Sequence, residues 1–224
     1  MKKEWTIEQV KGYMEPHRND ENAIPMTKYM KNHFPFLGIK TPERRLLFKT
    51  MANEMKLPPY EEMEKEVWEL FQLEEREYHY IAIELLSKYK TQLSVKDLPF
   101  CQRLVETKSW WDSVDSLAPK IVADIVIANR MAGETVMVEW AKSSNLWTNR
   151  ASILHQLKYK EKTNEELLFA TIERHSASKE FFLQKSIGWV LREYAKTRPQ
   201  VVQEFVGSHK LAPLSKREAL KHFK

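Results

Sequence analysis

Apolar residues recur along this chain at the spacing of one helix face. Over residues 6–17 they lie three or four positions apart, at Ile7, Val10, Tyr13 and Met14, which is the period of an amphipathic α-helix. The same spacing predicts further helices over residues 22–33, 42–56, 60–72, 75–90, 97–107, 110–129, 134–143, 148–160, 164–175, 179–197, 199–208 and 215–223. No segment shows the alternation of a strand, so the pattern predicts an all-α fold.

Proline and glycine mark the joints between these helices, at Pro58-Pro59, Pro99, Gly133, Pro199 and Pro213. Helices joined this closely are typical of antiparallel pairs. Three helical stretches also resemble one another, starting at Trp111, Trp147 and Phe182, with offsets of 36 and 35 residues. One further period before Trp111 leads to Glu75.

This period suits a two-helix repeat of HEAT or armadillo type. Such repeats stack into a curved solenoid whose concave face is lined by one helix of each pair. Because no linker or low-complexity segment interrupts the pattern, we expect one domain over residues 1–224.

Composition agrees with a helical, soluble protein. The whole chain has only 5 glycines, fewer than a sheet-rich fold of 224 residues needs for its turns. The one cysteine, Cys101, excludes an internal disulfide and indicates a reducing compartment. The N-terminus lacks the apolar core of a signal peptide, and the apolar run over residues 121–128 is too short to span a bilayer. We therefore expect a cytoplasmic protein with no membrane contact.

Most signatures of catalytic chemistry are absent from the sequence. There is no phosphate-binding or dinucleotide-binding glycine loop, no nucleophile elbow and no zinc motif among the seven scattered histidines. We therefore expect neither a metal nor a cofactor, and an enzyme built from this chain must work by electrostatics and positioning. The formal net charge of +5 is compatible with a nucleic-acid partner but is weak evidence alone.

One short stretch, residues 109–115, joins two indoles and two carboxylates. Ser109 is predicted to cap a helix, with Asp112 completing a capping box and so serving structure. Trp111 and Asp115 are four residues apart and share a helix face. An aromatic plane beside a carboxylate can hold a cation. The alternative is a tryptophan in the core and an aspartate in water.

Further candidates follow at a regular spacing. Trp111, Arg150 and Trp189 are each 39 residues apart, which places them on corresponding helices of neighbouring repeats, staggered by about one turn. If those helices line the concave face, all three converge there with Asp115. Alternatively, the tryptophans pack between helices and Arg150 is a solvated charge.

Four motifs resemble the bacterial AlkD-type DNA alkylation repair glycosylases, and the resemblance covers nearly the whole chain. They are Phe36-Leu37-Gly38-Ile39-Lys40-Thr41-Pro42-Glu43-Arg44-Arg45, Thr107-Lys108-Ser109-Trp110-Trp111-Asp112-Ser113-Val114-Asp115, Trp147-Thr148-Asn149-Arg150 and Lys185-Ser186-Ile187-Gly188-Trp189.

The resemblance implies HEAT-like repeats around a basic groove that holds duplex DNA. It implies hydrolysis of the N-glycosidic bond of cationic N3- and N7-alkylated purines, as base excision repair by a monomer. Trp111, Asp115, Trp189 and Arg150 match its active-site residues. Implied DNA contacts are Arg150, Tyr29, Arg44, Arg45 and Lys185.

Two other functions remain open from the sequence. One is a HEAT-type adaptor that binds proteins and has no catalysis, for which Asp115 beside Trp111 has no use. The other is a non-catalytic binder of DNA structure, which would keep a basic groove without needing Asp115.

Overall fold

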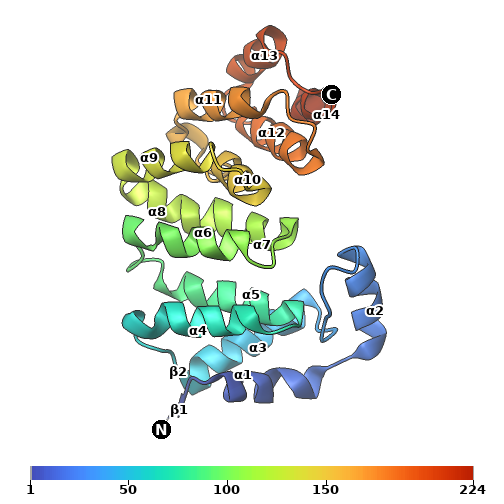
Figure 1. Ribbon diagram of the computed structural model, residues 1–224, viewed down its shortest axis with the longest axis vertical. Coiled ribbons are helices and arrows are strands. Elements are labelled where there is room, and N and C mark those ends of the chain that lie inside the picture. Colours follow the sequence, from blue (N-terminus) through green and yellow to red (C-terminus); the bar gives the residue numbers. More distant parts are fainter. Residues whose placement is uncertain (1, 224) are drawn as a thin grey trace. The chain divides into compact units, whose positions relative to one another are not determined.

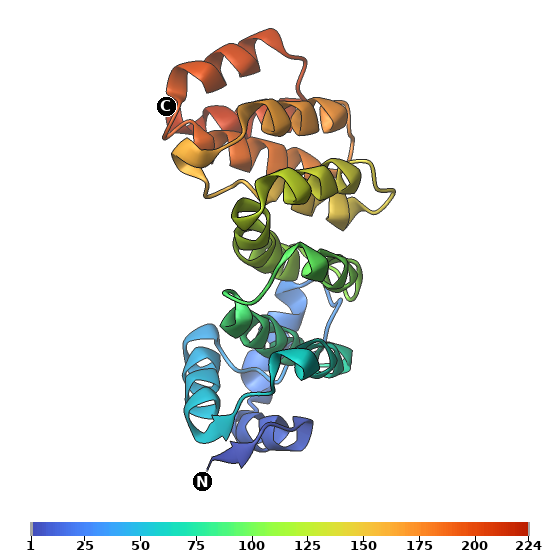
Figure 2. The same cartoon turned by 90° about the vertical axis from the view of Figure 1, so that its left-hand side faces the viewer.

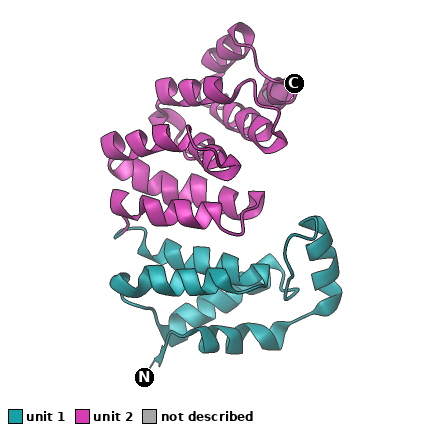
Figure 3. Cartoon of the chain, in the orientation of Figure 1, with its two compact units in different colours: residues 1–92 teal, residues 93–224 magenta. Residues whose placement is uncertain are grey.

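The computed structural model describes residues 2–223, and most of them lie in helices, as the sequence predicts (Figure 1). The chain divides into two compact units, residues 1–92 and residues 93–224 (Figure 3). This division into compact units does not test the expectation of one domain over residues 1–224, which stays a prediction.

Unit 1 is built from five α-helices and one short strand pair among its described residues. The helices are α1 (Ile7–Met14), α2 (Asp20–Tyr29), α3 (Thr41–Glu54), α4 (Tyr60–Gln72) and α5 (Arg76–Leu86), and the strands are β1 (Lys3–Glu4) and β2 (Met55–Lys56). Helices α4 and α5 pack side by side (Figures 1 and 2). Single 3-10 turns follow α1 and α5, at Glu15–His17 and Ser87–Tyr89.

Unit 2 contains nine α-helices among its described residues. They are α6 (Leu98–Glu106), α7 (Trp111–Ser116), α8 (Ala123–Ala128), α9 (Arg130–Trp140), α10 (Leu146–Leu154), α11 (Glu165–His175), α12 (Phe181–Tyr194), α13 (Pro199–Ser208) and α14 (Pro213–Ala219). A π-helical turn over Leu117–Val122 joins α7 to α8, so the predicted helix over residues 110–129 is continuous but irregular. Short 3-10 turns lie at Val95–Asp97, Lys160–Lys162 and Leu220–Phe223.

Helix α10 lies between α7 and α12, and it contacts both of them (Figure 1). Val114, Ile153 and Leu191 are fully buried on these three helices and belong to the core of unit 2. Helix α14 packs closely on α12 at Gly188, where the absence of a side chain makes room for Glu218. A Cβ at Gly188 would lie only 2.4 Å from the Cβ of Glu218. Of the three helices that carry most of the predicted site, α10 thus packs directly against both of the others.

The sequence prediction is wrong in several details. The parallel pair β1–β2 is a strand contact that the pattern did not predict, because two residues per strand are too few to show alternation. The helix predicted over 22–33 begins earlier and ends at Tyr29, because Asn19 caps it and Lys31 and Asn32 adopt left-handed backbone angles. Gly133 lies inside α9 rather than at a joint.

The close approach of two helices explains Gly133. A Cβ there would lie 2.7 Å from the Cα of Val126 on α8, so the glycine lets α8 and α9 pack closely. A glycine can serve close packing as well as chain reversal, and the sequence alone does not separate the two uses.

Glu77 holds the loop that leads into α3. Its carboxylate, which is fully buried, accepts hydrogen bonds from the backbone N–H groups of Leu37, Gly38 and Ile39 at 2.9, 2.9 and 3.0 Å. Burial raises the pKa of Glu77, and these three bonds oppose that rise. The motif over residues 36–39 therefore has a structural role in unit 1.

Gly38→Ala is expected to destabilise the protein by about 2 kcal/mol or more. Gly38 has φ +87°, and a Cβ there would lie 1.9 Å from the backbone oxygen of Asn19. Gly12→Ala is the matched control, since Gly12 lies within α1 with no atom within 4 Å of a new Cβ. It should stabilise by about 0.5–1 kcal/mol. Urea unfolding measures both, and equal effects of the two substitutions would contradict this account.

Candidate functional site

Helix α7, which carries Asp115, begins at Trp111 with Trp110 as its N-cap residue, one residue later than predicted. Trp110 is extended, with φ −157° and ψ 165°, and no side chain caps α7. The predicted N-cap at Ser109 is wrong, because the Ser109 hydroxyl donates instead to the carbonyl of Val105 at 2.7 Å. Asp112 therefore completes no capping box with Ser109, and it is buried as the second residue of α7.

Four helices share a constant repeat frame. Helices α5, α7, α10 and α12 begin at Arg76, Trp111, Leu146 and Phe181, which are 35 residues apart in each case. The predicted offset of 36 residues between the first two of the three stretches is one residue too long, and the offset of 35 between the second and third is correct. The stagger of Trp111, Arg150 and Trp189 is confirmed, since they are the first, fifth and ninth residues of successive helices.

The corrected frame places Asp115, Arg150 and Lys185 at one position. Each is the fifth residue of its helix, on α7, α10 and α12 in turn. Helix α10 packs against both α7 and α12, so Arg150 has a neighbouring helix with a fifth-position residue on each side. At the contact between α7 and α10, this arrangement brings the opposite charges of Asp115 and Arg150 together.

Asp115 and Arg150 form a buried ion pair through two parallel hydrogen bonds. Arg150 Nε donates to Asp115 Oδ1 at 2.8 Å, and Nη2 donates to Oδ2 at 2.9 Å. The side chains are only 16% and 5% exposed. Arg150 Nη1 also donates to the carbonyl of Phe182, so three of the five N–H groups of the guanidinium have described partners.

The environment of Asp115 combines two opposing effects on its pKa. On balance the pKa of the Asp115 carboxyl is raised, because burial raises it more than the hydrogen bonds and charge of Arg150 lower it, and Asp112 raises it further. A guanidinium held in a bidentate contact favours the ionised partner strongly. Asp115 is therefore a desolvated carboxylate at neutral pH, with the other side of each oxygen able to accept a further hydrogen bond.

A cluster of aromatic rings adjoins Arg150 through Phe182, and the sequence analysis missed its arrangement. The rings of Trp110, Trp147 and Phe182 lie with centroids 4.9 to 5.6 Å apart, at the starts of α7, α10 and α12. We call them the aromatic triad. Trp147 and Phe182 are 35 residues apart, and that interval was the signal available in the sequence.

Trp111 and Trp189 are both partly exposed. Trp111 lies one turn before Asp115 on α7, and Trp189 lies one turn after Lys185 on α12. Neither is sealed in the core, so the alternative that both tryptophans serve only interior packing loses support.

Lys185 belongs to a cationic cluster around Glu218 of α14. Lys185, Arg192 and Lys221 approach the Glu218 carboxylate to 3.2, 2.8 and 2.7 Å. The hydrogen bond from Lys221 is the largest effect that lowers the pKa of Glu218, to about 2. Three cations on one carboxylate leave two positive charges in excess, which suits an anionic partner.

The other predicted DNA contacts belong to unit 1. Tyr29 ends α2 and is 69% exposed, and Arg45 is exposed on α3. Arg44 is only 7% exposed, donates to Glu84 at 3.1 Å, and lies over the ring of Tyr80 at 4.4 Å. The guanidinium of Arg44 is thus held within unit 1.

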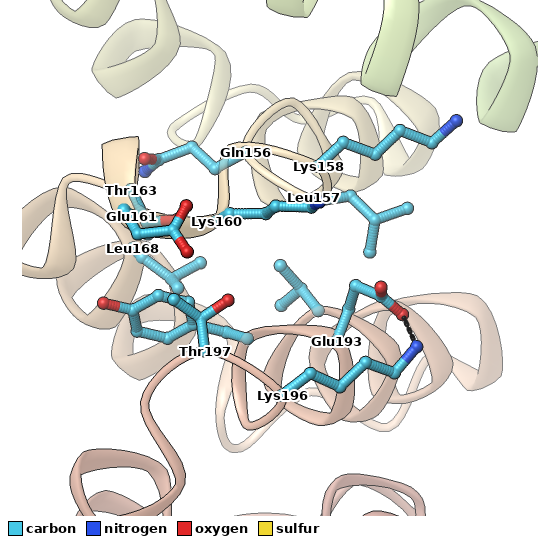
Figure 4. Close-up of a pocket in the computed structure, with 12 residues that line it drawn as sticks. Gln156, Leu157, Lys158, Lys160, Glu161, Thr163, Leu168, Glu193, Lys196 and Thr197 are labelled. Carbon is cyan, nitrogen blue, oxygen red and sulfur yellow. Dashed lines mark hydrogen bonds and ion pairs between the residues drawn. The ribbon is translucent and has the colours of Figure 1, made fainter.

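A separate cavity of about 690 Å³ lies in unit 2, at the C-terminal end of α12. Lys158, Lys160 and Lys196 are among its lining residues, and Lys196 pairs with Glu193 (Figure 4). None of the predicted site residues lines this cavity. In the described part of the chain, no group of three or more His, Cys, Asp or Glu residues is placed to hold a metal ion. None of the described helices has the length and apolar character that crossing a membrane requires.

Comparison with known proteins identifies relatives over most of the chain. The family model described as DNA alkylation repair enzyme matches residues 10–223. A solved structure described as a predicted DNA alkylation repair enzyme from Enterococcus faecalis is 38% identical and covers 92% of this chain and 96% of its own, with a TM-score of 0.86. AlkD2 from Streptococcus mutans is 20% identical and covers 81% and 89%, with a TM-score of 0.63. Comparison with curated proteins gave no match.

Arg150→Lys is expected to lower the free energy of unfolding by about 2 kcal/mol, because a lysine cannot reproduce the bidentate contact. Arg217→Lys is the matched control, since Arg217 is exposed on α14 of the same unit. It should change stability by no more than about 0.5 kcal/mol. Urea titration followed by tryptophan fluorescence measures both variants, and an Arg150→Lys protein as stable as the control would show that the pair contributes little.

Proposed function

The chain belongs to the DNA alkylation repair enzyme family, and we propose that it is a DNA glycosylase acting on cationic N3- and N7-alkylated purines in duplex DNA. The observation that carries the proposal is the desolvated Asp115 carboxylate, fixed by Arg150 at the fifth position of neighbouring repeats. Hydrolysis of the N-glycosidic bond releases the alkylated base and leaves an abasic deoxyribose.

The charge of the substrate determines what the site must supply. An N3- or N7-alkylated purine is positively charged and leaves as a neutral base, so it needs no proton from a general acid. As the bond breaks, positive charge develops on the deoxyribose. A carboxylate stabilises that charge and accepts a hydrogen bond from the attacking water, and we assign both tasks to Asp115.

Arg150 weakens the stabilisation of the sugar cation by Asp115, but it also keeps Asp115 ionised. A carboxylate about 4 Å from the sugar cation stabilises it by about 4 kcal/mol at an effective dielectric near 20, and a guanidinium about 7 Å away opposes this by about 2 kcal/mol. The net of about 2 kcal/mol corresponds to about 20-fold in rate. In return, Arg150 keeps the buried carboxyl ionised and fixes its orientation.

The partly exposed tryptophans supply surfaces for the damaged nucleotide. Trp111 and Trp189 each offer an aromatic face that attracts a cationic base or the C–H groups of its sugar. Backbone phosphates suit Lys185, with its cationic cluster, and Arg45, while Tyr29 offers an exposed ring. Arg44 stays a predicted contact, although its guanidinium already binds Glu84 and packs on Tyr80.

The proposal is tested by base release from duplex DNA treated with a methylating agent. Free N7-methylguanine and N3-methyladenine are expected in the supernatant, with uracil released far more slowly from uracil-containing duplex, because no described group here is placed to protonate a neutral leaving group. Binding of methylated DNA without base release would instead indicate a non-catalytic DNA binder. Absence of both would indicate a protein adaptor.

Asp115→Asn is expected to lower the single-turnover rate of N7-methylguanine release by about 100-fold. Loss of the Asp115 charge removes up to about 4 kcal/mol of stabilisation, or up to about 1,000-fold in rate, because Arg150 keeps its opposing charge. We expect about 100-fold, since solvent and DNA phosphates also stabilise the sugar cation. Because Arg150 loses its partner, unfolding free energy should also fall by about 3 kcal/mol. Rates are therefore compared at a temperature at which circular dichroism shows that both proteins are folded.

Glu134→Gln is the matched control for Asp115→Asn. Glu134 is a 19% exposed carboxylate of the same unit, accepts from Asn164 at 2.8 Å and lies 3.9 Å from Arg130. Its loss should lower stability without slowing base release. An Asp115→Asn protein that works within a few fold of the parent would refute the catalytic role of Asp115.

A further inference from the structure

Phe182 contacts Arg150 through both its backbone carbonyl and its ring. Its carbonyl accepts a hydrogen bond from Arg150 Nη1, and its ring centroid lies 5.9 Å from the Arg150 guanidinium carbon. The same ring packs edge-on against Trp110, with centroids 5.0 Å apart, and lies tilted against Trp147 at 4.9 Å. One residue at the start of α12 thereby touches the starts of both α7 and α10.

These contacts determine where the guanidinium of Arg150 lies. Nε and Nη2 donate to Asp115, and these two bonds hold one edge of the planar guanidinium. The bond from Nη1 to the Phe182 carbonyl fixes the opposite side. A planar group held on two sides cannot rotate, and its carboxylate partner is then fixed as well.

The position of that carbonyl depends in turn on the Phe182 ring. The carbonyl belongs to the first turn of α12, and the ring wedged against Trp110 and Trp147 fixes this turn against α7 and α10. Without the ring, the first turn of α12 loses its contact with both tryptophans. The hydrogen bond to Arg150 then lengthens although the backbone carbonyl itself remains.

We propose that Phe182 is a positioning residue that orients Asp115 through Arg150. Its importance for catalysis rests on the proposed glycosylase function, whereas its effect on the ion pair does not. The charged groups that face Asp115 are Arg150 from α10 and Asp112 from its own helix. Loosening Arg150 weakens the group that lowers the pKa of Asp115, so that pKa rises.

The test compares three variants by single-turnover base release as a function of pH. Phe182→Leu should lower the rate constant at saturating DNA by about tenfold, as expected for a misplaced catalytic group, with little change in DNA affinity. The acid limb of its rate profile should move to higher pH, because Asp115 must be ionised to act. Phe182→Tyr keeps the ring and should restore both the rate and the profile.

Phe205→Leu is the matched control for a purely structural loss. Phe205 is a buried aromatic residue of the same unit, on α13, stacked on Phe169 and His209 with centroids 4.2 and 4.1 Å apart. It should lower the melting temperature as Phe182→Leu does, but leave the rate and the acid limb unchanged. Equal rates and equal acid limbs for the two leucine variants would overturn the proposal.

A titration without substrate separates this inference from the proposed function. The side-chain carboxyl carbon of Asp115, observed by carbon-13 NMR, should titrate at higher pH in Phe182→Leu than in the parent and in Phe205→Leu. If the parent releases no base but the titration shifts, the glycosylase proposal fails and the positioning role of Phe182 stands. If the parent releases base and neither the titration nor the rate changes, the positioning role fails.

Discussion

The buried ion pair between Asp115 and Arg150 is the constraint on which this part of the structure depends. A guanidinium that is 5% exposed loses most of its hydration, and only a well-placed anion offsets that cost. Helix α10 can therefore pack against α7 only in the register that sets Arg150 level with Asp115. The Phe182 carbonyl extends the same requirement to α12. In the sequence, this register appears as the 35-residue interval between the starts of α7, α10 and α12.

The pair also reconciles two demands on the carboxylate. A carboxylate that stabilises a developing cation is most effective where water is excluded, but exclusion of water favours its protonated form. Arg150 resolves the conflict by keeping Asp115 ionised in a desolvated position, at the cost of part of the attraction for the sugar. A substrate that already carries a positive charge tolerates this reduction, because its base leaves without protonation.

Much of the fold could be predicted from the sequence, but only part of the site. Apolar periodicity identified the helices, and α4 and α13 match their predicted limits. The faint repeat placed Asp115, Arg150 and Trp189 on corresponding helices, but aligning Trp111 with Trp147 shifted the frame by one residue. That shift hid the pairing of Asp115 with Arg150. Arg44 shows a second limit, because its partners Tyr80 and Glu84 lie on α5, some 40 residues later.

The central claim is that Asp115 and Arg150 act as one unit, and a double-mutant cycle tests it most directly. Single-turnover base release at saturating DNA is measured for Asp115→Asn, Arg150→Gln and the double variant. If the residues act as a unit, the double variant should be slower than the parent by about as much as the slower single variant. If instead Arg150 acts alone as a phosphate contact, the two losses multiply in the double variant, and the account is contradicted.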